Sequence, residues 1–248
     1  MYDYWLGGKD NFAADRDMAE RATSFLPDIP RLARANRDFL VRAVRFLAER
    51  GIRQYIDLGT GLPTSPNVHE VAREVQPGAR VAYVDIDSMV VAHSRAMSAG
   101  VGVATVHADM RDPAAVLGDP AVRHVIDFDE PAALLMVAVL HYMAPDDDVP
   151  ALLRRYRDTL AHGSYLAASV PTADGLDGIV RRRAQALFGR TDIPARAWTR
   201  PEVAGLLADI HPVRPGIVPI TDWRVDEPGF DVQILGAVGA FRRRRPIS

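Results

Sequence analysis

Five short apolar segments alternate with helix-length segments through the middle of this chain, and this alternation limits the possible folds more than any other feature. Strands that alternate with helices form a parallel sheet covered by helices on both faces. The fourth segment is apolar throughout, as expected of a strand buried on both sides. We therefore predict an α/β fold. The five segments are QYIDLG, RVAYVDID, GVATVHAD, AALLMVAVLH and SYLAASV, with helices expected at about 66–76, 88–98, 112–119 and 149–161.

Further elements flank this pattern on both sides. Apolar periodicity predicts two helices before the first strand, at about 10–26 and 31–50. A helix over RPEVAGLLADI and two late strands, GIVPI and DVQILGAVGAF, follow the fifth strand. We therefore expect an N-terminal helical extension or lid, residues 1–50, and one sheet domain, residues 51–248. The arginine-rich segment 172–197 is either a cap over a ligand pocket or a helix that faces water.

Composition excludes several kinds of chemistry. The 248 residues contain no cysteine, which rules out disulfides, thiolate catalysis and cysteine-ligated metals. No HExxH motif or His/Asp cluster indicates another metal site. The formal net charge of −2 lacks the basic excess that nucleic-acid partners require. No apolar run is long enough to span a membrane and no signal-peptide pattern is present, so we expect a cytoplasmic protein.

The first strand leads into DLGTGLPTSPN, and in an open parallel sheet ligands bind at this kind of turn. Gly59 and Gly61 allow the backbone to come close to a ligand, and Ser65 can cap the next helix. A dinucleotide fingerprint requires glycine or alanine where this chain has Thr64, which counts against a pyrophosphate ligand. A nucleoside ligand without phosphates, such as S-adenosylmethionine (SAM), suits the turn better.

Acidic residues stand at the ends of three successive predicted strands. Because the carboxyl ends of parallel strands meet at one edge of a sheet, we expect these acids to face one ligand. Asp57 would lie near the methionine end of SAM, Asp85 would accept from both ribose hydroxyls, and Asp109 would accept from the adenine amino group, with Met110 beside the ring. The residues predicted to contact the cofactor are Asp57, Gly59, Thr60, Gly61, Asp85, Ile86, Asp109, Met110 and Ala138.

The order of these motifs resembles that of class I SAM-dependent methyltransferases. More narrowly, YDYWLGGKDNF, RANRDFL, DLGTGLPT, NVHEVA and VAVLHYM look like one methyltransferase family of high-GC bacteria, long known as a domain of unknown function. The resemblance covers nearly the whole chain. It implies a Rossmann-like, mostly parallel seven-stranded sheet with an antiparallel last strand, an N-terminal helical extension and SAM as cofactor. Family members usually carry several residues before the opening tyrosine, and the sequence does not decide whether the native start lies upstream of Met1.

Lys9 is the only lysine of the chain, and it lies in the opening motif beside two glycines and two tyrosines. An ammonium is a compact point charge that arginine does not replace equivalently. We predict that Tyr2, Tyr4, Lys9 and Asn11 fold over the mouth of the cofactor site, where Lys9 meets a carboxylate of SAM or of a substrate. The alternative is that the tyrosines fix the tail to the body of the protein and Lys9 faces water.

The catalytic prediction concerns His141, which closes the fourth predicted strand, close to where the methyl group is expected. Methyl transfer from a sulfonium is an in-line displacement in which positioning does most of the work. His141 would serve as a base, or would only shape the pocket. We expect a small-molecule acceptor; the sequence does not indicate which one, whether O, N or C is methylated, or the oligomeric state. The alternatives are a non-catalytic SAM-binding module and an NAD(P)-dependent oxidoreductase, which would require a Tyr-x-x-x-Lys pair that is absent here.

Overall fold

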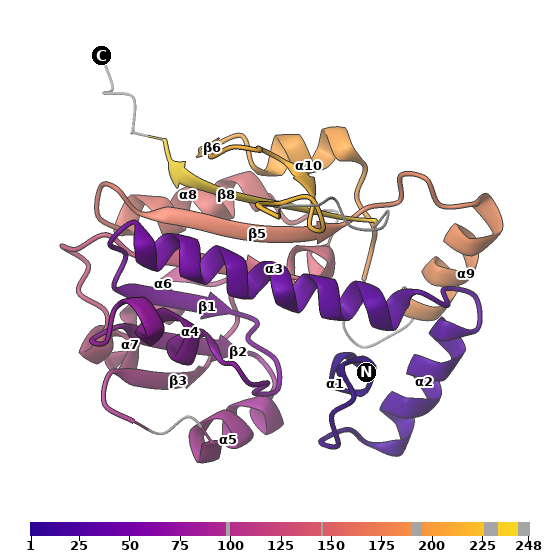
Figure 1. Ribbon diagram of the computed structural model, residues 1–248, viewed down its shortest axis with the longest axis horizontal. Coiled ribbons are helices and arrows are strands. Elements are labelled where there is room, and N and C mark those ends of the chain that lie inside the picture. The colour runs from indigo at the N-terminus through magenta and orange to yellow at the C-terminus, as the bar shows by residue number, and fades with distance from the viewer. Residues whose placement is uncertain (98–99, 145, 190–194, 226–232, 243–248) are drawn as a thin grey trace.

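An eight-stranded mixed sheet forms the centre of the computed structural model (Figure 1), which describes residues 1–97, 100–144, 146–189, 195–225 and 233–242. The strands follow one another in the order β3-β2-β1-β4-β5-β8-β6, with β7 paired to β8 beside this path. Strands β1 to β5 are parallel, and β8 runs antiparallel to β5. The strands are β1 (Gln54–Leu58), β2 (Arg80–Asp85), β3 (Val103–His107), β4 (Ala133–Val137), β5 (Tyr165–Pro171), β6 (Ile210–Pro212), β7 (Val218–Pro219) and β8 (Ile234–Phe241).

The predicted Rossmann-like sheet with an antiparallel last strand is confirmed, and the differences lie among the short late strands. The predicted strand GIVPI is reduced to the two residues of β7. The structure adds β6, whose first residue, Ile210, was expected to end a helix. Ile210 is buried and pairs with Phe241 of β8, so it belongs to the sheet and the helix ends before it. Residues 231–232 of the predicted last strand lie outside the described residues.

Helices cover both faces of the sheet. They are α1 (Tyr2–Leu6), α2 (Ala13–Thr23), α3 (Ile29–Glu49), α4 (Val68–Val75), α5 (Ser88–Met97), α6 (Pro113–Gly118), α7 (Pro120–Val125), α8 (Val149–Thr159), α9 (Gly178–Phe188) and α10 (Arg200–Leu206), together with the 3-10 turn η1 (Leu140–Tyr142). The short α1 was not predicted, because five residues carry no helical periodicity. Asn67, and not Ser65, caps α4 together with Glu70. The helix expected at 10–26 is α2, which is shorter at both ends. Its start is set by the Asp15 carboxylate, which accepts from the backbone N–H of Phe12.

The sheet separates two apolar cores. Side chains alternate between the faces along a strand, so Ile56 and Leu58 of β1 belong to one core and Tyr55 belongs to the other. The second core lies under α3, whose Phe39 and Phe46 meet the ring of Trp223 edge-on, at centroid distances of 5.4 and 5.6 Å. The long helix α3 is thereby fixed along the sheet.

The other N-terminal helices gather at one end of the sheet. Figure 1 shows α1, α2 and α9 beyond the carboxyl ends of the parallel strands, whereas α3 runs along the sheet itself. Helix α1 contacts α3, and α2 contacts α9. The described part of the arginine-rich segment 172–197 thus contains a helix without buried residues, α9, which packs against α2. This exposure agrees with the prediction of a helix that faces water, whereas a cap over a ligand pocket stays a prediction.

Trp223 is expected to stabilise the fold more than any other single aromatic side chain of this core. Replacing Trp223 with Ala should lower the free energy of unfolding by about 3–5 kcal/mol, because a fully buried ring leaves a large cavity. Trp223→Phe should cost much less, because it keeps a ring and removes an indole N–H that is buried without a partner among the described residues. Urea unfolding measures both changes. Equal losses in the two variants would contradict this account.

Candidate functional site

The glycine turn after β1 is tied to the neighbouring strand. Gly59 and Gly61 have φ angles of +66° and +65°, in the left-handed region that glycine tolerates. The backbone N–H groups of Gly59 and Thr60 donate to the carbonyl of Val84, at 2.8 and 3.2 Å. A Cβ at Gly59 would lie 2.4 Å from Val139 Cγ1, whereas a Cβ at Gly61 would meet no atom within 4 Å. Gly59 is therefore required by packing, and Gly61 presents bare backbone.

Two of the predicted acids flank this turn. Asp57 is only 6% exposed and accepts from Thr60 Oγ1 at 3.1 Å. Burial raises the pKa of Asp57 to about 6, and the nearby charge of Asp85 adds to this effect. Asp85 accepts from the backbone N–H of Gly61 with one oxygen and from that of Asp87 with the other, each at 2.9 Å. Burial also raises the pKa of Asp85. The parallel sheet thus brings Asp57, Thr60, Gly61 and Asp85 together.

Asp109 and Met110 lie after β3, and both already have partners. The Asp109 carboxylate is held by Arg111, with Nη2 to Oδ2 at 2.6 Å and Nε to Oδ1 at 3.0 Å. These hydrogen bonds lower the pKa of Asp109. The Met110 carbonyl accepts from the hydroxyl of Tyr156 at 2.7 Å, and its side chain packs against the core. The role of both residues at the adenine ring stays a prediction.

Large apolar side chains are exposed beside Asp85. Ile86 is 45% exposed and Tyr142 is 40% exposed. Burial raises the pKa of the Tyr142 phenol, and the charge of Asp85 raises it further. The phenol therefore lies near that carboxylate. Exposed apolar surface next to buried acids is typical of a ligand site. Sequence reasoning included Ile86 but missed Tyr142, although the motif VAVLHYM contains it.

A chain of hydrogen bonds joins the opening segment to the ends of β4 and β5, and its central link, between Asn36 and Ser169, is buried. Tyr2 donates to the carbonyl of Ala33 and accepts from Asn36 Nδ2, at 2.9 and 3.0 Å. Asn36 Oδ1 accepts from Ser169 Oγ at 2.6 Å. Ser169 Oγ accepts in turn from the backbone N–H of Ala138 at 2.9 Å. Ala138 has a φ of +55°, so this chain supports a left-handed residue directly after β4.

His141 lies in η1, three residues after Ala138. Its ring stacks at a tilt on Tyr142, with centroids 4.0 Å apart. Nδ1 is buried and has no partner among the described residues. Burial lowers the pKa of His141 to about 4, so the ring is neutral at physiological pH. His141 contacts Tyr142, which in turn lies near Asp85, and its basicity is much lower than that of an ordinary histidine. Its predicted place beside the methyl group stays a prediction.

The remaining residues of the opening segment mainly hold α1 and α2 together. Tyr4 donates to Glu20 at 3.0 Å, and Asn11 Nδ2 donates to Asp3 Oδ2 at 2.7 Å. Lys9 is exposed on the connection between α1 and α2, and its ammonium makes no ion pair with the part of the chain that the structure describes. The contacts of Tyr4 and Asn11 stabilise this segment, and a role of Lys9 toward a carboxylate stays a prediction.

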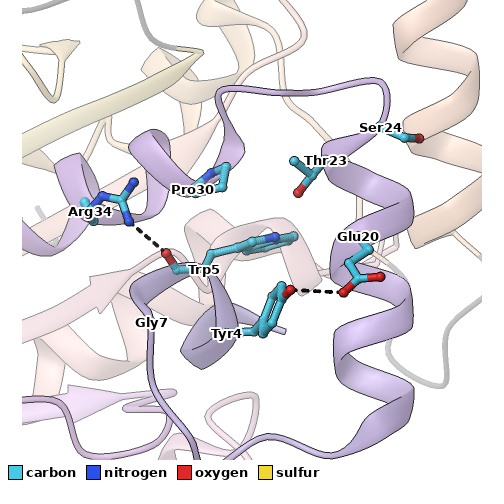
Figure 2. Close-up of a pocket in the computed structure, with 8 residues that line it drawn as sticks. All are labelled: Tyr4, Trp5, Gly7, Glu20, Thr23, Ser24, Pro30 and Arg34. Carbon is cyan, nitrogen blue, oxygen red and sulfur yellow. Dashed lines mark hydrogen bonds between the residues drawn. The ribbon is translucent and has the colours of Figure 1, made fainter.

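A cavity of about 560 Å³ lies among the three N-terminal helices, apart from the glycine turn. Figure 2 shows Tyr4 and Trp5 of α1 opposite Glu20 of α2, with Arg34 of α3 donating to the carbonyl of Trp5 at 3.2 Å. Its lining residues are Tyr4, Trp5, Gly7, Glu20, Thr23, Ser24, Pro30 and Arg34. None of the predicted cofactor residues lines this cavity. The acids at the strand ends indicate a cofactor site more strongly than the cavity does.

Arg37, like Tyr142, is a residue of this site that sequence reasoning missed. It extends from α3 to the loop after Gly61, where Nη2 donates to the carbonyls of Thr64 and Pro66. Its charge lowers the pKa of Asp57, against the stronger effect of burial. Nε is buried and has no partner among the described residues. The signal was present in the motif RANRDFL, but nothing in the sequence connects that helix with the loop.

The donor set fits SAM. A bare glycine backbone, two buried carboxylates and an exposed apolar surface match an uncharged ribose, a zwitterionic amino-acid end and an adenine ring. Among the described residues, no group of three histidines or acids could hold a metal ion. No helix in those ranges has the length and apolarity needed to cross a membrane.

The sheet order and the acid-flanked glycine turn are those of the class I methyltransferase fold. The comparisons agree. The chain belongs to the S-adenosyl methyltransferase family, whose model matches residues 1–242. It is therefore a SAM-dependent methyltransferase, and neither the oxidoreductase nor the non-catalytic alternative finds support. A search of curated proteins gave no match.

Solved structures extend this result. A proposed methyltransferase from Thermobifida fusca YX is 42% identical, covers 98% of this chain and 93% of its own, and has a TM-score of 0.90. A DUF574 family protein from Streptomyces avermitilis MA-4680 is 39% identical, with coverage of 97% and 95% and a TM-score of 0.89. The 1,6-didemethyltoxoflavin N1-methyltransferase of Burkholderia thailandensis is 20% identical, with coverage of 95% and 93% and a TM-score of 0.50, and shares the fold.

His141 is expected to stay neutral across the physiological pH range. An unperturbed histidine titrates near about 6.5, whereas burial lowers the pKa of His141 to about 4. The imidazole resonances of labelled protein, assigned by their loss in His141→Gln, should therefore not shift between pH 8 and about 5. A midpoint near 6.5 for this ring would show that the site is open to water and would contradict the structure.

Proposed function

We propose that this methyltransferase acts on a small-molecule acceptor, bound between the carboxyl ends of β4 and β5 and a lid formed by α1 and α2. The observation that carries this proposal is the chain of hydrogen bonds from Tyr2 through Asn36 to Ser169, because it fixes α1 against the strand ends. A lid held in this way suits a small acceptor better than a folded macromolecule. The lack of a basic excess, with a net charge of −2, supports the same conclusion.

The roles of the chain's own residues follow from their positions. When bound, SAM supplies a methyl group already activated on a sulfonium. We assign Asp57 to the ammonium of the methionine moiety and Asp85 to the ribose hydroxyls, since each keeps free lone pairs beside the turn. Ile86 offers an apolar face to the adenine ring. Gly61 allows the backbone to approach without a Cβ.

His141 is assigned to orienting the acceptor. A ring with a pKa of about 4 is a weak base at neutral pH, but its unpartnered Nδ1 can form a hydrogen bond with an acceptor group. Positioning of this kind is what an in-line displacement from an activated donor requires. We assign Lys9 to a carboxylate on the acceptor side, because it lies on the connection between α1 and α2.

The cofactor assignment predicts a specific loss of affinity. Asp85→Asn should weaken SAM binding by about 10- to 100-fold, because the ribose hydroxyls lose a charged acceptor. Calorimetric titration measures this change, and titration with NADH should give no heat. Asp129→Asn is the matched control, since Asp129 is exposed before the opposite end of β4. Equal SAM affinity in Asp85→Asn and the wild type would exclude the assignment.

A second prediction concerns pH. Because the pKa of Asp57 is raised to about 6, this carboxyl gains a proton as the pH falls from 7 to 5. The ammonium of SAM binds the ionised form, so affinity should fall by about tenfold over this range. Asp57→Asn should bind SAM weakly and should lose most of this pH dependence. A variant that keeps the full pH dependence would assign it to another group, such as Asp85.

The size of the acceptor can be tested directly. A bacterial extract is separated by ultrafiltration, and each fraction is incubated with the enzyme and methyl-labelled SAM. We expect S-adenosylhomocysteine (SAH) and labelled product to form with the filtrate. Label incorporated only into the retentate would overturn the small-molecule proposal and leave the enzyme class unaffected.

A further inference from the structure

We propose that Arg37 binds the carboxylate of the methionine moiety of SAM and thereby selects ligands that carry this group. The proposal rests on the function proposed above, in that Asp57 receives the ammonium of the same moiety. It assigns to α3 a ligand contact in addition to its packing against the sheet.

The position of Arg37 is fixed by the loop that follows Gly61. Its Nη2 donates to the carbonyls of Thr64 and Pro66, which lie on either side of Ser65. The guanidinium therefore borders the segment that leads away from the bare backbone of Gly61. A ligand that rests its amino-acid end on this turn would bring its carboxylate close to the arginine.

The hydrogen-bonding capacity of Arg37 is only partly used. A guanidinium has five N–H donors in a planar fork. Nε is buried without a partner among the described residues, and leaving such a donor unpaired is costly. A carboxylate pairs with the fork in a bidentate way and satisfies donors of this kind. The unpaired Nε donor and the positive charge of Arg37 thus both favour a carboxylate.

Asp57 and Arg37 together match a zwitterion. The charge of Arg37 acts on the Asp57 carboxyl, yet no ion pair within 4.0 Å joins the two side chains among the described residues. Two opposite charges that are close but not paired leave room for the ammonium and the carboxylate of one amino-acid group. Lys9 differs from Arg37 in being fully accessible on the connection between α1 and α2.

The test compares two ligands that differ only in this carboxylate. They are SAH and its decarboxylated analogue, S-(5′-adenosyl)-3-thiopropylamine. Calorimetry gives the affinity of each for the wild type, Arg37→Gln and Arg37→Lys. The first control is Arg45→Gln, on the same helix, whose arginine forms an exposed ion pair with Glu74 at 2.7 Å. The second is Lys9→Gln.

We expect the wild type to prefer SAH by about 10- to 100-fold, the range of a charged hydrogen-bonded pair. Arg37→Gln should lose most of this preference by weakening SAH binding, with the affinity for the analogue changed by no more than about threefold. Arg37→Lys should keep part of it, because the charge stays and the fork is lost. Arg45→Gln and Lys9→Gln should behave as the wild type.

Three results would overturn the proposal. Equal weakening of both ligands in the Arg37 variants would mean that Arg37 only holds the loop. A preference lost in Lys9→Gln and kept in Arg37→Gln would assign the carboxylate to Lys9. Binding of neither ligand by the wild type would refute the proposed cofactor site itself. Thermal unfolding of each variant identifies any that does not fold, and Arg37→Lys then decides the outcome.

Discussion

The hydrogen bond between Asn36 on α3 and Ser169 on β5 is the contact on which the shape of the candidate site depends. Both side chains are buried, so each would be costly without its partner. Ser169 also receives the backbone N–H of Ala138, and Asn36 also donates to Tyr2. This buried pair therefore fixes both the left-handed residue Ala138 after β4 and the position of α1. The end of β4, which leads to His141, and helix α1 therefore depend on each other for their positions.

The site concentrates polar groups that do not favour stability on their own. Burial raises the pKa values of Asp57 and Asp85, so their ionised forms are disfavoured in the folded chain. Arg37 Nε and His141 Nδ1 are buried without partners among the described residues. Such groups persist where the rest of the fold determines their positions. Here the rest includes the two apolar cores, which hold β1, β4 and α3 in place and thereby fix the positions of these groups.

The sequence predicted those features that depend on local pattern or on strand direction. The acids at the carboxyl ends of β1 and β2 come together because parallel strands end at one edge of the sheet, and this follows from the order of the segments alone. Gly59 and Gly61 were identified from the same reasoning. The bounds of α2 and α10 were less accurate, because Phe12 and Ile210 take conformations set by Asp15 and by β8.

Residues brought to the site by tertiary packing could not be predicted. Asn36 and Arg37 lie on a helix whose apolar periodicity identifies its buried face but not its partners. Their contacts with Ser169 and with the loop after Gly61 join segments 133 and 27 positions apart. Tyr142 was missed for a similar reason, since its proximity to Asp85 depends on the pairing of β4 with β1 and of β1 with β2. Lys9, which composition singled out, lies outside this network.

The low pKa of His141 bears on the chemistry of the acceptor. A general base is most effective when its pKa is near the working pH, and a value of about 4 is far below neutrality. An acceptor that had to lose a proton from an ordinary alcohol would receive little help from this ring. An acceptor that is already a good nucleophile, such as a neutral amine or an ionised phenol, needs only to be held in line with the sulfonium. The burial that makes His141 a poor base also keeps its ring neutral and fixed, which is the property that such positioning requires.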